Sequence, residues 1–204
     1  MISLNVVIWD ETAVIDRCLK TAQPFVDEIV LMVDDSCRFV DRLLEYTDNV
    51  LYSRLANSIV EHHRNKLIEA SNHPWILVMD PDEFLGQSLG PCLRKYCQIA
   101  DVHDPPIDGY WISRYNIVYD DDYNLQVGTD YPDWNLRFFR KHARYSGTIY
   151  EDSKHLGNHP NPLGLERTQY IPDGILYHDK TYENIEEVNR TIALYKKWQS
   201  SQSR

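Results

Sequence analysis

The chain contains an apolar run that ends abruptly in acid, Trp75-Ile76-Leu77-Val78-Met79-Asp80-Pro81-Asp82-Glu83-Phe84. Its apolar part has the length of a buried strand, and open α/β sheets present ligand-binding groups where such strands end. Mg²⁺ and Mn²⁺ prefer oxygen ligands and commonly link one or two carboxylates to the phosphates of a substrate. Asp80-Pro81-Asp82 is also an ordinary turn composition. The rest of the sequence therefore has to decide between a metal site and a solvated turn.

The first half of the chain alternates segments of strand and helix character. Strands are expected at residues 4–9, 29–33, 50–52 and 75–79, and helices at residues 10–23, 39–46 and 58–70. This alternation predicts a parallel sheet that is covered on both faces. Because parallel strands end at one edge of a sheet, the acids that follow them are expected to converge there. These acids are Asp10, Glu11, Asp34, Asp35, Asp80, Asp82 and Glu83.

The second half of the chain has a different character. Residues 109–119 and 134–140 are rich in aromatic and β-branched side chains, which predicts strands of a mixed or antiparallel region. Residues 154–172 are rich in Pro, Gly, Asn and His, which predicts a long irregular loop of the kind that covers a site or binds an acceptor. A strand at 175–177 and an amphipathic helix at 184–198 are expected to complete the fold.

These elements predict a single domain with a three-layer α/β/α sandwich. Its central sheet is expected to be mostly parallel, with a smaller mixed or antiparallel part. Residues 1–100 would form a nucleotide-binding half, and residues 101–204 an acceptor-side half that ends in the C-terminal helix.

Composition narrows the possible partners and locations. The 204 residues include 21 Lys and Arg against 31 Asp and Glu, for a net charge of -10, and the basic residues are scattered, so nucleic acid is not an expected partner. No apolar run approaches the roughly 20 residues of a membrane helix, and the N-terminus lacks the features of a signal peptide. We therefore expect a cytoplasmic protein with no transmembrane segment, compatible with peripheral association with a membrane. The four cysteines lack metal-binding spacing, so reduced thiols are expected.

Short motifs follow one another in a characteristic order along the chain. They are Val7-Ile8-Trp9-Asp10-Glu11, Asp27 to Ser36, His63-Arg64-Asn65, Trp75 to Glu83, Leu136-Arg137-Phe138-Phe139-Arg140, Tyr145 to Glu151, and Tyr177-His178. Their order and spacing resemble the family-2-type glycosyltransferases of the GT-A fold, in particular small lipopolysaccharide core glucosyltransferase-like enzymes. The resemblance implies a metal-dependent, inverting hexosyltransferase of glycan biosynthesis. Its donor would be a nucleotide-diphosphate sugar, above all a UDP-sugar, and its acceptor a hydroxyl group of a glycan, lipid or protein.

The Asp-x-Asp motif and His178 are the metal-binding candidates that this resemblance implies. Asp82 would be the most direct ligand of Mn²⁺ or Mg²⁺, with Asp80 close by, His178 on the far side and Glu83 in support. Such an ion would neutralise the charge that accumulates on a departing diphosphate. A histidine just before a helix can also be a cap or a packed side chain.

Five residues are expected at the nucleotide: Glu11, Asp34, Asp35, Arg64 and Asp80. Asp34 and Asp35 can accept hydrogen bonds from the imide of uracil or from ribose hydroxyls. Acids that precede helices also oppose the helix dipole, and the two roles are compatible. Arg64 lies away from the apolar stripe of its expected helix, so it would pair with Asp35 or Asp80 or reach the nucleotide.

An inverting transfer needs a carboxylate that removes the proton of the acceptor hydroxyl. Glu151 matches the glutamate of the family, and Asp152 is the alternative. Tyr150 stands where the family has a histidine, which leaves the position of the base open between the two. Arg137 and Arg140 would either reach the diphosphate or the acceptor or form a solvated strand face.

Other functions fit parts of the sequence. Phosphatases of the haloacid-dehalogenase type also place Asp-x-Asp after an apolar strand and use the first carboxylate as the nucleophile. They carry it near the start of the fold, however, with Thr or Val after the second Asp. Nucleotidyltransferases need a glycine-rich loop after the first strand, and residues 9–12 contain no glycine. A non-catalytic descendant that binds nucleotide or glycan remains as a third alternative.

Overall fold

The computed structural model describes residues 1–9, 14–55, 60–119, 125–127, 133–145 and 161–180. Several of the expectations lie outside these residues. They concern Asp10, Glu11, the start of the helix at 58–70, Glu151, Asp152 and the helix at 184–198.

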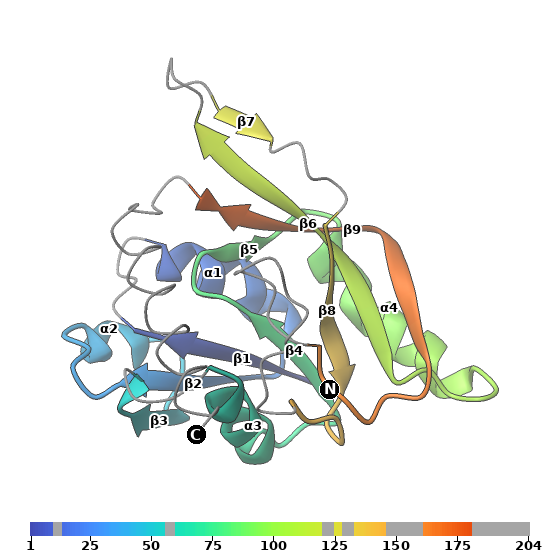
Figure 1. The fold of residues 1–204 in the computed structure, drawn as a ribbon, viewed down its shortest axis with the longest axis horizontal. Coiled ribbons are helices and arrows are strands. Elements are labelled where there is room, and N and C mark those ends of the chain that lie inside the picture. Colours follow the sequence, from blue (N-terminus) through green and yellow to red (C-terminus); the bar gives the residue numbers. More distant parts are fainter. Residues whose placement is uncertain (10–13, 56–59, 120–124, 128–132, 146–160, 181–204) are drawn as a thin grey trace, which may run out of the picture.

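The described part of the chain folds into nine strands and four α-helices (Figure 1). The strands are β1 (Ile2–Ile8), β2 (Glu28–Asp34), β3 (Val50–Ser53), β4 (Trp75–Met79), β5 (Glu83–Leu85), β6 (Gly109–Tyr119), β7 (Leu125–Val127), β8 (Asp133–Arg140) and β9 (Thr168–Asp179). The helices are α1 (Ile15–Ala22), α2 (Val40–Leu43), α3 (Val60–Ala70) and α4 (Leu89–Val102), and a short 3-10 turn (Gln23–Phe25) follows α1. None of these helices is long and apolar enough to span a lipid bilayer.

All of the strands belong to one sheet. Its order is β3-β2-β1-β4-β8-β6-β9-β5, and β7 pairs with β6 beside this path. β1, β2, β3 and β4 are mutually parallel, as the sequence predicts. β8 runs antiparallel to both β4 and β6, whereas β9 is parallel to β6 and antiparallel to β5. The expected parallel half and the expected mixed half are therefore joined edge to edge through the β4–β8 pair.

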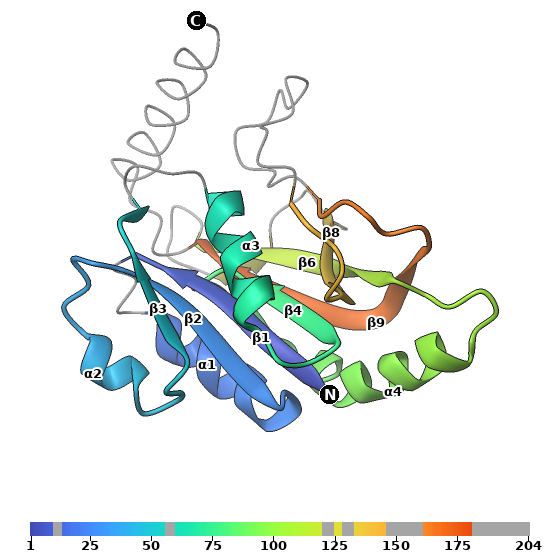
Figure 2. The same ribbon diagram turned by 90° about the horizontal axis from the view of Figure 1, so that it is seen from below.

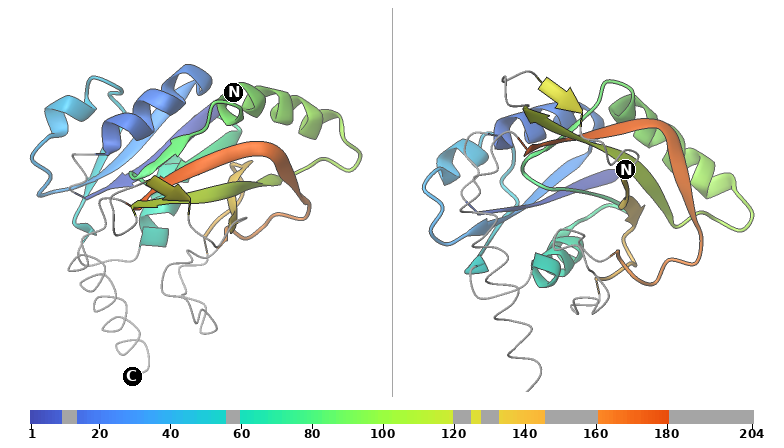
Figure 3. Two further views of the ribbon diagram at one scale, coloured as in Figure 1. Left: turned by 90° about the horizontal axis from the view of Figure 1, so that it is seen from above. Right: turned by 45° about the horizontal axis from the view of Figure 1, so that its top comes forward.

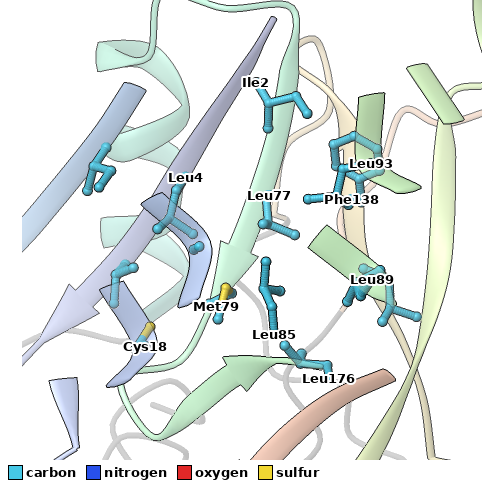
Figure 4. Packing of buried hydrophobic residues seen from close by; sticks show 14 of the residues in the cluster. Ile2, Leu4, Cys18, Leu77, Met79, Leu85, Leu89, Leu93, Phe138 and Leu176 are labelled. Atoms are coloured by element: carbon cyan, nitrogen blue, oxygen red, sulfur yellow. The ribbon is translucent and has the colours of Figure 1, made fainter. Parts of the chain in front are cut away.

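Helices cover the two faces of this sheet, so that the molecule has three layers (Figures 2 and 3). The largest buried cluster joins α1 and α4 to β1, β4 and β6, and Cys18, Leu93, Leu4 and Leu77 are among its members (Figure 4). On the other face, residues of α3 pack against β2 and β4 in two smaller clusters. All five residues of β4 are buried, which is why the sequence shows a continuous apolar run there.

Three features differ from the sequence expectations. The acidic turn is followed at once by strand β5, and α4 fills residues for which the sequence suggested no element. The irregular loop expected up to residue 172 ends earlier, because β9 begins at Thr168. Pro172 argued against a strand here in the sequence. In the structure it lies at a bulge, where the β6–β9 register shifts between Ile112 and Ser113, and proline is tolerated at such a position.

Glu28 links four segments at the amino end of the sheet. Its carboxylate accepts hydrogen bonds from Ser3 Oγ at 2.5 Å, from Asn49 Nδ2 at 3.2 Å, and from the backbone N and Nδ2 of Asn72 at 2.8 and 2.6 Å. Burial alone would raise the pKa of Glu28, but these hydrogen bonds outweigh it and lower the pKa below 4.5. The ionised side chain therefore stabilises the folded state.

We predict that Glu28→Gln lowers the free energy of unfolding by about 1–3 kcal/mol at pH 7, because donors lose a charged acceptor. The folded pKa lies below the unfolded value, so this contribution is present above the unfolded pKa and is lost as the pH falls through the folded pKa. Urea unfolding at pH 7 and in progressively more acidic buffer measures it. Exposed Glu45→Gln is the control, and a difference that persists in acid would contradict the assignment.

Candidate functional site

The candidate site lies at the carboxyl edge of the parallel strands, where β4 leads through the acidic turn into β5. β1 and β2 end at this same edge, and β9 reaches it from the other half of the sheet by pairing with β5 (Figure 1). The register places Glu83 opposite His178 and His178 opposite Asn116. Residues far apart in the sequence therefore meet around the acidic turn.

Two buried arginines hold Asp80. Arg64 Nη2, from α3, lies 2.5 Å from Asp80 Oδ1, and Arg137 Nη2, from β8, lies 2.6 Å from Asp80 Oδ2. The side chain of Arg64 is only 2% exposed. Burial alone would lower the pKa of Arg137, but the carboxylates of Asp80 and Glu83 outweigh it and raise that pKa above its usual value. Because arginine stays protonated in proteins, both guanidinium groups are charged, and they engage both oxygens of Asp80.

Glu83 is fully buried and is the centre of a larger charge cluster. Its carboxylate accepts hydrogen bonds from Arg137 Nη2 at 2.9 Å, from Arg114 Nη1 at 3.4 Å, and from the backbone N of Asp80 at 2.9 Å. Arg114 also donates from Nε and Nη2 to Asp133 Oδ2, at 2.9 and 2.6 Å. Glu83 thereby connects the acidic turn to β6 and β8. This is how it could support Asp82, the role expected for it.

Asp82 is the carboxylate of the motif that faces His178. Its Oδ2 lies 3.0 Å from His178 Nε2, and His178 Nδ1 lies 2.9 Å from Asn116 Oδ1. The other oxygen of Asp82, Oδ1, is buried and has no hydrogen-bond partner among the described residues. The backbone of the turn is fixed on both sides, because Glu83 N donates to Asp80 O at 3.0 Å and Asp179 N donates to Asp82 O at 2.9 Å.

Both ring nitrogens of His178 face oxygen acceptors. Two arrangements satisfy both: either the amide of Asn116 donates to Nδ1 while Nε2–H donates to Asp82, or Nδ1–H donates to Asn116 and a cation takes the place of the hydrogen at Nε2. The second arrangement is the usual one for a metal-bound histidine, whose other nitrogen donates to a neighbouring oxygen. The 3.0 Å gap between His178 Nε2 and Asp82 Oδ2 also matches neighbouring ligands of an octahedral ion with bonds of about 2.1 Å.

Asp82 and His178 therefore fit a divalent cation, whereas Asp80 does not. Its two oxygens are taken by Arg64 and Arg137, so it is a poor direct ligand. Within the residues that the structure describes, no three His, Cys, Asp or Glu side chains are grouped so as to hold a metal ion. A bound substrate or water can supply further ligands, as is common for Mg²⁺.

The two acids after β2 have different environments. Asp34 is buried and accepts hydrogen bonds from Ser36 N and Oγ, at 2.9 and 2.5 Å, and from Leu55 N at 2.7 Å. Burial alone would raise the pKa of Asp34, but these bonds and one from Trp9 outweigh it and hold the pKa below 3.8. Asp35 is exposed. The structure thus gives Asp34 a local structural role and leaves Asp35 as the acid that is open to a ligand.

The expected site residues are thus only partly brought together. Arg64, Asp80, Asp82 and His178 converge, and Arg64 pairs with Asp80, one of the partners expected for it. Of the two alternatives expected for Arg137, the solvated strand face is not found, because its side chain is buried and pairs with Asp80 and Glu83. Sequence reasoning missed Arg114 and Asn116 as neighbours of Glu83 and His178. The sequence signal that could have indicated them is that each is a polar residue within the aromatic, β-branched segment 109–119.

No protein-family model matches the sequence, and no curated protein matches it either. Solved structures do match. S. aureus TarS is 16% identical, with a TM-score of 0.56 over 95% of this chain and 39% of that chain. TarS in complex with UDP-GlcNAc is 14% identical, with a TM-score of 0.59 over 90% of this chain and 59% of that chain. TarS in complex with UDP is 15% identical, with a TM-score of 0.56 over 95% of this chain and 64% of that chain.

The chain therefore spans between 39% and 64% of the length of these neighbours. At such low identity, the likeness concerns the fold. The expected mixed α/β fold of the GT-A type is confirmed by this likeness and by the curled, largely parallel sheet.

We predict that Asp80→Asn lowers the free energy of unfolding by about 3 kcal/mol, at the lower end of the range for breaking a buried ion pair, because Arg137 keeps Glu83. The matched control is Asp101→Asn, which removes a surface partner that lies 2.5 Å from Arg140. That change should cost less than about 1 kcal/mol. Urea unfolding of both variants tests the difference, and equal costs would show that the Asp80 cluster is not a buried one.

Proposed function

We propose that this chain transfers a sugar, a hexose in the first instance, from a nucleotide-diphosphate sugar to a hydroxyl group of a glycan, lipid or protein acceptor. The observation that carries the proposal is the Asp82–His178 pair at the carboxyl edge of the sheet, with Oδ1 of Asp82 buried and without a partner among the described residues. The fold around this pair matches TarS, which has been solved with UDP and with UDP-GlcNAc. A UDP-sugar is therefore the proposed donor.

The nucleotide would bind across the ends of β1 and β2. Asp35 is exposed there and can accept hydrogen bonds from ribose or uracil, and Glu11 is proposed beside it. Arg64 and Asp80 are also proposed near the nucleotide, but as a mutually neutralised pair. The finer likeness to small lipopolysaccharide core glucosyltransferases belongs to this proposal and rests on the order of the motifs.

Asp82 and His178 would hold Mn²⁺ or Mg²⁺, with Asn116 orienting the imidazole of His178. When bound, such an ion supplies positive charge against the charge that builds up on the departing diphosphate. Asp80 would act indirectly, because Arg64 and Arg137 fix its carboxylate and its backbone N donates to Glu83. In this proposal, Asp82 is the carboxylate of the turn that meets the ligand.

For an inverting reaction, Glu151 would accept the proton of the acceptor hydroxyl as its oxygen attacks the sugar, and Asp152 is the alternative base. Both residues lie outside the described part of the chain, and the assignment rests on the family resemblance.

A phosphatase of the haloacid-dehalogenase type is not favoured. In that reaction the first carboxylate of Asp-x-Asp attacks phosphorus and must be free to do so. Here that residue is Asp80, and buried arginines engage both of its oxygens.

We predict that UDP binds in the presence of Mn²⁺ and that Asp82→Asn reduces this metal-dependent affinity at least tenfold, because a charged ligand of the ion is lost. Isothermal titration calorimetry with UDP, with and without Mn²⁺, measures it. The control is Asp48→Asn, which changes an exposed carboxylate away from the turn and should bind like the wild type. If no nucleoside diphosphate binds with metal, the glycosyltransferase proposal fails.

We further predict that Glu151→Gln keeps the affinity for UDP but stops transfer, because the amide cannot take up the proton. Release of UDP from a UDP-sugar in the presence of acceptor is the readout. Full activity of this variant would move the base elsewhere, with Asp152→Asn as the next variant. A wild-type chain that binds UDP-sugars but never releases UDP would favour the non-catalytic alternative.

A further inference from the structure

Helix α1 packs alongside β5, the short strand that follows the acidic turn (Figure 1). Two hydrogen bonds fix the helix there. The thiol of Cys18 donates to Asp80 O, with Sγ at 3.6 Å, and Leu85 N donates to Thr21 Oγ1 at 3.1 Å. α1 therefore contacts both the start of the acidic turn and the end of β5.

Arg17, on the same helix, contacts both strands of the β5–β9 pair. Its Nη2 lies 2.8 Å from Oδ2 of Asp179, at the end of β9. Its guanidinium also lies over the ring of Phe84 in β5, with Cζ 4.8 Å from the ring centroid. Phe84 is itself stacked on Tyr177 of β9, at a centroid distance of 5.1 Å. We call these two contacts of Arg17 the Arg17 bridge.

The Arg17 bridge lies behind the candidate metal pair. Side chains alternate along a strand, so Phe84 and Asp179 project from the face opposite to Glu83 and His178. The carboxylate of Asp179 is 5% exposed, whereas Arg17 is 42% exposed. Arg17 therefore acts on the metal pair through the backbone of the two strands that it joins.

Asp179 is the residue through which the Arg17 bridge reaches the metal pair. Its backbone N donates to Asp82 O at 2.9 Å, and it directly follows His178. The buried arginines hold the start of the acidic turn through Asp80, whereas this bond holds its end. A shift of Asp179 would change the 3.0 Å gap between Asp82 Oδ2 and His178 Nε2. Small divalent cations demand near-ideal ligand positions, so they would bind less tightly.

We propose that Arg17 is a positioning residue for the metal pair: through Asp179 and Phe84, it sets the spacing of Asp82 and His178 at which a divalent cation binds. Arginine suits this role because its flat group can pair with a carboxylate and stack on an aromatic ring at once. This inference rests on the proposed function, since it concerns the cation of the same reaction.

Positioning and simple electrostatics predict opposite effects when Arg17 loses its charge. A positive charge near the pair repels a cation, so its removal would strengthen cation binding if charge alone mattered. Loss of the Arg17 bridge would instead weaken cation binding, because groups that orient metal ligands contribute to metal affinity. The sign of the change in Mn²⁺ affinity therefore decides between the two.

The test measures UDP affinity by calorimetry over a series of Mn²⁺ concentrations, which gives the affinity of each protein for the ion. We expect Arg17→Met to need about tenfold more Mn²⁺ than the wild type. Arg17→Lys keeps the charge but not the flat group over Phe84, so it should need about threefold more. Lys20→Met is the matched control, because it removes one positive charge from an exposed side chain of the same helix and should behave like the wild type.

Metal-free calorimetry and urea unfolding separate a local effect from a general loosening of the fold. UDP affinity without Mn²⁺ should be the same in all four proteins. Unchanged or tighter Mn²⁺ binding by Arg17→Met would overturn the inference, and so would an equal loss in Lys20→Met or in metal-free UDP affinity. If urea unfolding shows that Arg17→Met is not folded, Arg17→Lys decides, and its equality with the wild type would overturn the inference. A wild type that binds no UDP at any Mn²⁺ concentration would contradict the proposed function itself.

Discussion

Three arginines with little contact to solvent have to be neutralised at the junction of the two halves of the sheet. Arg64, Arg114 and Arg137 approach this point from α3, β6 and β8. The carboxylates of Asp80, Glu83 and Asp133 meet them, so that the charges balance within the cluster. An unpaired buried charge costs several kcal/mol, which makes the relative placement of these elements a condition for folding. The position of the acidic turn follows from that balance.

The same balance distinguishes the three acids of the turn, although they are close together in the sequence. Asp80 and Glu83 form ion pairs with arginines, whereas Asp82 faces the imidazole of His178. The motif therefore presents one pair of carboxylate oxygens, those of Asp82, toward a ligand. Its neighbours serve to hold that pair in place, which is a different role from sharing a cation equally.

Local patterns were sufficient to predict the elements that are buried on both faces or are amphipathic. The boundaries of β4 are those expected, because its apolar run and its acidic end are contiguous in sequence. The pairing of Arg64 with Asp80 was among the expected alternatives, since helix periodicity turned Arg64 away from the apolar stripe. β5 was not predicted, because a strand this short is created by its partner β9, which lies far along the chain.

The parts of the site that sequence reasoning missed depend on contacts between distant segments. Asn116 meets His178 across 62 positions and Arg114 meets Glu83 across 31, and no local pattern encodes either contact. Asp34 illustrates the opposite problem. Its place after a strand indicated a ligand contact, but the donors that occupy its carboxylate come from the adjoining Ser36 and from Leu55 after β3. Whether a carboxylate at a sheet edge can bind a ligand therefore depends on whether nearby backbone amides already donate hydrogen bonds to it.

The acidic turn is held by backbone hydrogen bonds at both ends, from Glu83 N to Asp80 O and from Asp179 N to Asp82 O. Its residues consequently lose their conformational freedom when the chain folds and not when a ligand arrives. A ligand that binds there meets a preorganised surface and does not have to order it. The affinity of the site is thereby linked to the integrity of β9, so fraying of that one strand would loosen the turn without altering any residue in it.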